Sequence, residues 1–590
     1  MFNKTIKRSL LLSASSLFVI SSLTTVFLEN NQRIESKFQN NKLDDFANKN
    51  EALIKSKTAT FLIETKTNLN ADDSRSFNNL LAKQKNVLHV NKSEILDDLH
   101  FVNFNVENGQ SIKTFSNFLD KNQMVSKYFL YFDTNSENVD ELKADEKMFF
   151  NQKLKNSTSD NDTSFKNYFN SSYQKNFDTN NYKSVIRNEE IENAKKYLDN
   201  FNERIGILMT GVGSDQMNGQ SDYLIDNTDD FYFDTNNQNT HFIINDYKKV
   251  YYREFEPRFG KHTTQLASVI AGKNGINPYH KLYAIRGGTG KKNGKDFINF
   301  DRILKYALAR NDIKVISSSW GSPEGLGNTN YNIESYYLDR ISKENPELIF
   351  VFAVGNDGNA KNKEHKKLND INLSLNNIFV GSNDANLNVS NFSSYGSNSI
   401  SSGPLLLANG ENYAFKSDNG YSTGYSASII SGVLANTLLR YKDRYSLGKN
   451  NIIAKTVLAA ATKNITNDNQ SNQQIGLNAN YGAGVLDYLK LSNAFNNLRY
   501  ISWNNSDHGY INNNLRNINN NELLVASFKL KKNDLLRASL AWEFNAIDFK
   551  DITAIRDKTK WLSYDELDPL LKNPIIDNFD LYLKNKTVML

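Results

Sequence analysis

Short apolar runs alternate with helical patterns from Arg204 to about residue 500, and this alternation limits the possible folds more than any other feature. RIGILMTGV (204–212) and LIFVFAVG (348–355) have the length and continuous apolar character of buried strands, whereas GYSASIISGVLANTLLRY (424–441) has the length of a helix. Strands that alternate with helices predict a parallel sheet covered on both faces. In such sheets the chemistry lies at the carboxyl ends of the strands. We therefore expect an α/β domain whose site residues follow its strands.

The N-terminus has the pattern of an export signal. Basic residues up to Arg8 precede an apolar stretch from Leu10 to Leu28. A basic start followed by an apolar run is typical of secreted chains, and a run of this length could also span a bilayer as an uncleaved anchor. No obvious small-x-small cleavage site precedes Glu29, which favours the anchor. We expect residues 1–29 to be a signal peptide or membrane anchor, with the rest of the chain extracellular or at the cell surface.

The composition excludes several classes of function. The chain contains no cysteine, which excludes a disulfide scaffold, a thiol nucleophile and a cysteine-ligated metal. The net charge of +5 is small for 590 residues, and no compact Lys/Arg stripe is interleaved with aromatic residues, so we expect no nucleic-acid partner. No metal motif, phosphate loop or nucleotide fingerprint is present. The Lys- and Asn-rich composition, together with export, indicates a wall-less, AT-rich bacterium such as a mycoplasma.

Changes in pattern divide the rest of the chain. Residues 30–149 contain the patterns of a small α+β domain, with strands at ATFLIET, HFVNFNV and KYFLYF and helices at SFNNLLAKQKNV and SIKTFSNFLDKNQMV. Residues 150–195 are polar and predict a linker. Residues 196–504 form the α/β domain. Residues 505–590 are β-rich, with strands predicted at LLVASFKL, LLRASLAW and FDLYLKN, which are too few for a complete β-sandwich.

Within residues 196–504, a series of blocks resembles, in order, the subtilases, the subtilisin-like serine proteases of peptidase family S8. The blocks are ILMTGV, GKHTTQLASVIAG, KLYAIRG, VISSSWG, FVFAVGNDG, SNFSSYG, STGYSASIISGVLA, KTVLAAATK and YGAGVLDYLKLSNA. The resemblance implies a subtilisin-like parallel sheet flanked by helices, a propeptide-like N-terminal domain and a partial C-terminal β-sandwich. It implies no organic cofactor. Subtilases often bind structural calcium, but its ligands cannot be assigned here residue by residue.

A serine protease needs a nucleophilic hydroxyl, an imidazole base, a carboxylate that orients the base, and donors for the oxyanion. The resemblance assigns the base to His262, although the family's His-Gly-Thr is His-Thr-Thr here. It assigns the oxyanion donor to Asn356 in Gly-Asn-Asp-Gly. It assigns the substrate-lining strand to Ser319, Trp320 and Gly321, whose backbone could pair with an extended peptide.

The other required groups are absent from their expected places. The family's aspartate position in ILMTGV holds Met209, and a thioether is too weak an acceptor to orient an imidazole ring. When the helix is aligned on Gly432, Gly424 stands at the nucleophile position. Glycine has no side chain that could attack a carbonyl carbon. The resemblance therefore predicts a degenerate triad.

Several serines in this helix leave other alignments open. Reading Gly420-Tyr421-Ser422 as the family's Gly-Thr-Ser makes Ser422 the nucleophile, but it puts Ile430 where the helix-packing glycine belongs. Reading Gly424-Tyr425-Ser426 that way makes Ser426 the nucleophile, but the deletion this requires rotates the apolar face of the helix by about 200°. Asp215, in the loop that follows Met209, is the alternative orienting carboxylate.

The sequence thus supports several hypotheses. The first is an exported, catalytically degenerate subtilase that binds peptides or proteins at the cell surface. The second is an active serine endopeptidase with Ser422 or Ser426 as nucleophile, His262 as base and Asp215 or another acid behind it. The third is a purely structural α/β domain whose flanking domains do the binding.

Overall fold

The computed structural model describes residues 58–66, 69–132, 204–211, 222–236, 241–245, 258–286, 295–319, 333–360, 373–396, 403–415, 419–446, 448–465, 477–499, 516–519, 522–524, 531 and 536–544. They belong to two compact units: the first holds the described residues of 58–92 and 98–132, and the second holds the remainder. The predicted signal or anchor (1–29) and the linker (150–195) lie outside the described residues. Within the described part of the chain, no helix is both long and apolar enough to cross a membrane.

In the first unit, an antiparallel sheet carries two helices. Its elements, in chain order, are β1 (Thr58–Thr65), α3 (Ala71–Ala82), β2 (Val87–Lys92), β3 (Leu99–Asn105), α4 (Gly109–Lys121) and β4 (Val125–Phe132). The strands lie in the order β2-β3-β1-β4. The βαββαβ succession is that of ferredoxin-like α+β folds. Its core contains Phe61, whose ring centroid lies 5.4 Å from that of Phe104 and 4.9 Å from that of Phe115.

One element of this unit differs from the expectation. The sequence predicted a helix over residues 76–87, but α3 ends at Ala82 and β2 begins at Val87. Between them, Asn86 adopts a left-handed backbone with φ of 71°. Asparagine tolerates this conformation better than most residues, so it reverses the chain into β2. Val87, the last residue of the predicted helix, therefore belongs to a strand.

The second unit is built on one large sheet. Its strands are β5 (Gly206–Gly211), β7 (Phe242–Asn245), β9 (Lys281–Arg286), β10 (Ile313–Ser318), β11 (Ile349–Ala353), β12 (Ile378–Asn383), β13 (Leu406–Asn409), β16 (Thr462–Lys463) and β17 (Val485–Leu486). They lie in the order β16-β17-β13-β12-β11-β10-β5-β9-β7. Every pair is parallel except β16 with β17. The predicted parallel α/β sheet is confirmed.

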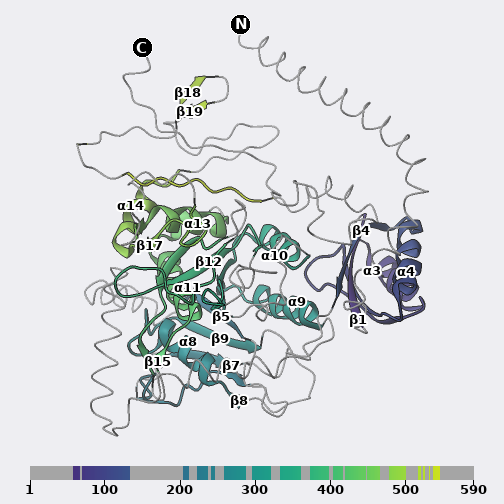
Figure 1. The fold of residues 1–590 in the computed structure, drawn as a ribbon, viewed down its shortest axis with the longest axis horizontal. Coiled ribbons are helices and arrows are strands. Elements are labelled where there is room, and N and C mark those ends of the chain that lie inside the picture. Colours follow the sequence, from purple (N-terminus) through teal and green to yellow (C-terminus); the bar gives the residue numbers. More distant parts are fainter. Residues whose placement is uncertain are drawn as a thin grey trace. The chain divides into compact units, whose positions relative to one another are not determined.

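Helices and short strand pairs complete this unit. Its helices are α8 (Lys261–Ala271), α9 (Lys295–Leu308), α10 (Ile333–Glu344), α11 (Thr423–Arg440), α12 (Lys442–Tyr445), α13 (Asn450–Ala460), the 3-10 turn η5 (Tyr488–Lys490) and α14 (Leu491–Asn496). Its short strands are β6 (Asp222–Leu224), β8 (Arg258–Phe259), β14 (Tyr413–Ala414), β15 (Asn419–Gly420), β18 (Arg516–Asn519) and β19 (Glu522–Leu524). Helix α11 contacts α8 and strands β10 to β13 (Figure 1).

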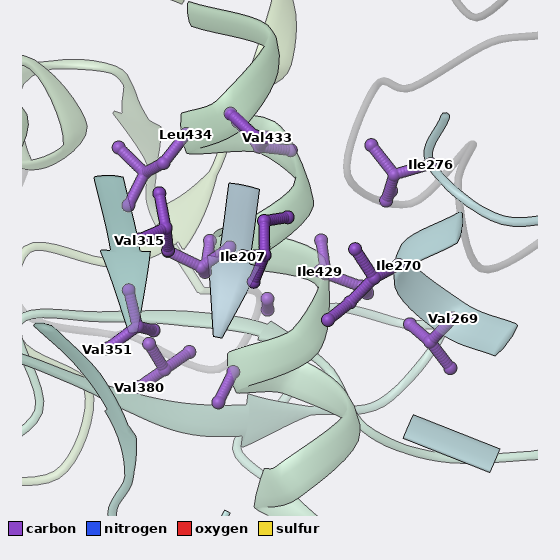
Figure 2. Close-up of a cluster of buried hydrophobic side chains, with 14 of the residues drawn as sticks. Ile207, Val269, Ile270, Ile276, Val315, Val351, Val380, Ile429, Val433 and Leu434 are labelled. Atoms are coloured by element: carbon purple, nitrogen blue, oxygen red, sulfur yellow. The ribbon is translucent and has the colours of Figure 1, made fainter. Parts of the chain in front are cut away.

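The core of the second unit lies between one face of the sheet and the helices α8 and α11. Figure 2 shows strand side chains facing those of α11, with the labelled residues Ile207, Val315, Val351, Val380, Ile429, Val433 and Leu434. Alternate strand residues such as Leu208, Ile316 and Phe350 point to the opposite face and are also fully buried. Burial of both faces is typical of a parallel sheet covered by helices.

The order of the strands identifies where a site should lie. After β5 the chain builds β7 and β9 on one side of that strand, and then β10 and β11 on the other. The reversal occurs between β5 and β10, and open α/β sheets bind their ligands at the carboxyl ends of the strands at such a point. Met209 and Thr210 of β5 lie there, opposite Ser317 and Ser318 of β10.

The C-terminal segment differs from the predicted run of strands. The strand predicted at LLRASLAW (535–542) is described from residue 536 onward, and residues 536–544 pair with no strand in the described part of the chain. Side-chain hydrogen bonds hold this segment instead. Asn376 bonds both backbone groups of Phe544, at 2.8 and 3.0 Å, and Ser539 Oγ donates to the Thr456 carbonyl at 2.6 Å. Of LLVASFKL only Leu523 and Leu524 are described, in β19, and FDLYLKN lies outside the described residues.

Candidate active site

The position predicted for the orienting carboxylate lies inside the apolar core. Met209 of β5 is 4% exposed and belongs to the buried cluster beneath α8 and α11. Its register partners are Ala284 on β9 and Ser317 on β10. A methionine packs well in such surroundings, but its sulfur is only a weak hydrogen-bond acceptor. The alternative carboxylate, Asp215, lies outside the described residues.

The predicted base is close to the first turn of α11. His262 is the second residue of α8, and its ring centroid lies 6.4 Å from that of Tyr425. Leu266 lies one turn further along α8, on the same helix face as His262. A Cβ atom added to Gly424 would lie 3.3 Å from Leu266 Cδ2. The face of α8 that carries His262 is therefore turned toward position 424.

Asn356 joins the end of β11 to the start of α11. Before it, Gly355 has a φ of 105°, a conformation that strongly favours glycine. The Asn356 Oδ1 atom accepts hydrogen bonds from the backbone N of Thr423 at 2.9 Å and from Thr423 Oγ1 at 3.0 Å. Its Nδ2 atom donates to Ser422 Oγ at 3.3 Å. The asparagine predicted as oxyanion donor thus lies at the N-terminus of α11.

The start of α11 brings two N–H donors to one oxygen atom. Ser422 is the N-cap residue, and its Oγ accepts a hydrogen bond from the backbone N of Gly424 at 3.0 Å. The same oxygen accepts the bond from Asn356 Nδ2. In serine proteases the nucleophile's own backbone N–H is one oxyanion donor, and in subtilisin an asparagine amide is another. The residue that supplies the backbone donor here is Gly424, which supports the alignment that puts glycine at the nucleophile position.

The second serine considered as a nucleophile lies in the core. Ser426 is fully buried, and its Oγ donates to the Ala408 carbonyl at 2.9 Å. Ser431, further along α11, bonds Ser317 Oγ at 2.9 Å and the Ala427 carbonyl at 2.8 Å. These serines satisfy their hydroxyl groups inside the protein. The serine-rich character of α11 is therefore explained in part by its packing against the sheet.

Only the first residue of the predicted substrate-lining strand is described. Ser319 follows β10, is half-buried, and its Oγ donates to the Gly424 carbonyl at 3.4 Å. Its Cβ atom would lie 3.2 Å from a Cβ atom on Gly424. Trp320 and Gly321 lie outside the described residues. The structure brings Ser319 to position 424, and peptide binding by this strand stays a prediction.

Several residues that support the site were not singled out from the sequence. Thr423 bonds Asn356, and the hydroxyl of Tyr425 donates to Gln265 Oε1 at 3.1 Å, which ties α11 to α8. Deeper in the unit, the Nε2 atom of the buried His280 lies 3.1 Å from the Gly432 carbonyl of α11. Burial lowers the pKa of His280 to about 4. Of these residues, Thr423 and Tyr425 flank Gly424 in the sequence, whereas Gln265 and His280 were indicated by no motif.

A metal site is not evident around these residues. Within the described residues, no group of three or more His, Asp or Glu side chains is placed to hold a metal ion. Subtilases need no organic cofactor.

The chain is similar to a known protein family and to several solved structures. A family model described as the subtilase family matches residues 146–484. No curated protein matches the chain. Among solved structures, the chain is similar to the epidermin leader peptide processing serine protease EpiP of Staphylococcus aureus, with 18% identity and a TM-score of 0.41 over 75% of this chain and 99% of that chain. It is also similar to the patellamide maturation protease PatA, with 18% identity and a TM-score of 0.35 over 50% of this chain and 96% of that chain.

Proposed function

The chain belongs to the subtilase family, and from this premise we propose that it is an exported, catalytically degenerate member that binds peptides or proteins at the cell surface. One observation carries the proposal. The Gly424 backbone N–H and Asn356 Nδ2 both donate to Ser422 Oγ at the start of α11, and this pair of donors supports residue 424 as the place of the nucleophile. Gly424 has no side chain, so no covalent acyl-enzyme can form there.

The methionine at position 209 also argues against catalysis, because no carboxylate stands there. In the family mechanism the base takes the proton of the nucleophile while a carboxylate holds the base in the productive tautomer. Met209 cannot do this, because it is buried among apolar side chains and carries no charge. In subtilisin, removal of the serine lowers turnover by about 2 × 10⁶ and removal of the aspartate by about 3 × 10⁴. Either loss alone would leave little hydrolysis.

Binding requires less of the site than catalysis. An extended peptide can join the edge of a strand through backbone hydrogen bonds alone, without a nucleophile or a base. In this proposal the segment that begins at Ser319 supplies that edge. The apolar run between Leu10 and Leu28 would carry the protein to the cell surface, either as a cleaved signal or as an anchor.

A fluorophosphonate probe separates this proposal from an active protease. We expect the purified full chain to show no covalent labelling and no cleavage of reduced, carboxymethylated lactalbumin. An active subtilisin, treated in parallel, is the positive control. Labelling that is lost in Ser422→Ala or Ser426→Ala would overturn the degenerate reading and identify the shifted nucleophile.

Binding is measured with the same polypeptide. Fluorescein-labelled carboxymethylated lactalbumin should show a saturable rise in anisotropy with the full chain, while gel electrophoresis shows it intact. If the polypeptide neither binds nor is cleaved, peptide binding by this domain is wrong. Binding that persists when the α/β domain is deleted would favour recognition by the flanking domains.

Export is tested on intact cells that express the full chain. External proteinase K should degrade the protein while a cytoplasmic marker stays intact. Full protection of the chain in intact cells, with degradation only after lysis, would contradict a place at the cell surface.

A further inference from the structure

We infer that the Ser422 hydroxyl closes the oxyanion hole of this chain, because its oxygen lies where the carbonyl oxygen of a reacting substrate would bind. This inference rests on the proposed function, since it takes position 424 as the former nucleophile position. The family pattern is Gly-Thr-Ser, so Ser422 stands where the family has a glycine. The change at position 422 is thus a further departure from the family pattern, beside those at Met209, Thr263 and Gly424.

The hydrogen bonds show more than an ordinary helix cap. A serine N-cap commonly accepts a bond from a backbone N–H in the first turn of its own helix, and the bond from Gly424 is of this kind. Helix capping does not explain the second bond, from Asn356 Nδ2 at 3.3 Å, because Asn356 follows β11 and lies 66 residues earlier in the chain. Both donors of the expected oxyanion hole therefore have the same internal acceptor.

The space around position 424 makes the residues at positions 422 and 424 depend on each other. A Cβ atom on residue 424 would lie 3.1 Å from Ser422 Oγ, closer than ordinary van der Waals contact. A serine nucleophile at position 424 and the Ser422 hydroxyl in its present place would therefore crowd each other. Glycine at position 424 leaves room for the hydroxyl, and glycine at position 422 would free the hole for a substrate.

Restoring a nucleophile tests the closure directly. In Gly424→Ser, the new hydroxyl can attack a fluorophosphonate: an O–P bond forms, the P–F bond breaks, fluoride leaves, and the hydroxyl proton passes to His262. The phosphoryl oxygen needs the two oxyanion donors. Loss of a single such donor costs about 10²–10³-fold in turnover in subtilisin. A closed hole should therefore slow labelling strongly.

The comparison uses variants that share Gly424→Ser. We expect the labelling rate of Gly424→Ser/Ser422→Gly to exceed that of Gly424→Ser by at least about tenfold. This factor is smaller than the about 10²–10³-fold that loss of a single oxyanion donor costs in subtilisin. Gly424→Ser/Ser422→Thr keeps a hydroxyl at position 422 and should stay as slow as Gly424→Ser. Equal rates in all of these variants would overturn the closure while leaving the proposed function intact. Labelling of the unmodified chain would instead overturn the proposed function.

A stability measurement tests whether the Ser422 hydroxyl occupies the oxyanion hole, even if no variant is labelled. Gly424→Ala adds only a Cβ atom, and its effect on the urea midpoint is measured with serine and with glycine at position 422. We expect a clear destabilisation when Ser422 is present and a smaller one in Ser422→Gly, where the contacts with Ser319 Cβ at 3.2 Å and Leu266 Cδ2 at 3.3 Å remain. The same shift of the midpoint in both backgrounds would show that the hydroxyl does not occupy the inferred place.

Discussion

The two sides of the candidate site, which we call the oxyanion side and the triad side, differ in the interactions of their residues. The oxyanion side, formed by Asn356, Thr423 and the Gly424 N–H, is bound into the protein by hydrogen bonds between the end of β11 and the start of α11. On the triad side, Met209 packs in the apolar core and position 424 has no side chain. The polar groups of the oxyanion side thus have a structural role, because they join β11 to α11. An asparagine in the oxyanion position is therefore weak evidence for catalysis when it also anchors a helix.

The prediction with the largest expected effect concerns the triad side, where Met209→Asp introduces a carboxylate. Met209→Asp should destabilise the second unit by about 3–5 kcal/mol at pH 7, because a charge is then buried among apolar side chains without a partner. Met209→Leu is the matched control and should cost less than about 1.5 kcal/mol. Both are measured by urea unfolding. Equal stability of the two variants would mean that a cation such as His262 reaches position 209 and that the triad geometry persists.

The second prediction concerns His280, which contacts the Gly432 carbonyl of α11. Helix α11 carries groups of both the oxyanion side and the triad side. Burial lowers the pKa of His280 from 6.5 to about 4, so the folded state stays neutral where the unfolded chain takes up a proton. His280 therefore does not lower the free energy of unfolding above pH 6.5. As the pH falls from 6.5 toward 4, protonation of the unfolded chain lowers that free energy by about 3 kcal/mol in total.

The control for this pH dependence is His280→Gln, whose amide can still donate to the Gly432 carbonyl but does not titrate. The free energy of unfolding, measured by urea at several pH values, should fall less in this variant than in the unmodified chain between pH 6.5 and 4. Parallel curves for the two proteins would show that His280 is not the group responsible.

The third test removes the anchor on the oxyanion side. Asn356→Ala deletes three hydrogen bonds, two with Thr423 and one with Ser422. Because Asn356 is exposed, each bond should contribute at the lower end of the usual range of about 0.5–1.5 kcal/mol, and we expect a loss of about 2 kcal/mol in unfolding free energy. Asn359→Ala, a nearby exposed asparagine, should change stability by less than about 0.5 kcal/mol. If the two variants were equally stable, the structural explanation for the retained asparagine would be wrong.

The smallest expected effect concerns the helix cap. Ser422→Ala should cost about 1 kcal/mol, because the Gly424 N–H loses its acceptor, and Ser422→Thr should restore most of that loss. Thermal unfolding of the variants gives the comparison. A Thr variant as unstable as the Ala variant would show that the cap bond is not what Ser422 contributes.

Parts of the fold failed to follow from the local pattern. The predicted helix over residues 76–87 missed the turn at Asn86, because the apolar periodicity of a short segment does not reveal a left-handed residue. The pattern of residues 535–542 predicted a strand, yet side chains such as Ser539 hold the described part of this segment in place. Whether an extended segment pairs as a strand depends on a neighbour that its own sequence does not specify.

The sequence by itself determined the parallel α/β architecture and the methionine at position 209. Burial on both faces imposes continuous apolar runs, and a strand without gaps fixes the register of each residue it contains. The nucleophile position was different, because Ser422, Gly424 and Ser426 lie in a serine-rich helix that allows more than one alignment. The tertiary structure adds what the sequence lacks at these positions: the bonds of Asn356 to the first turn of α11 and the burial of Ser426. Thr423 and Asn356 lie 67 residues apart, and no local periodicity records which distant side chain will meet the start of a helix.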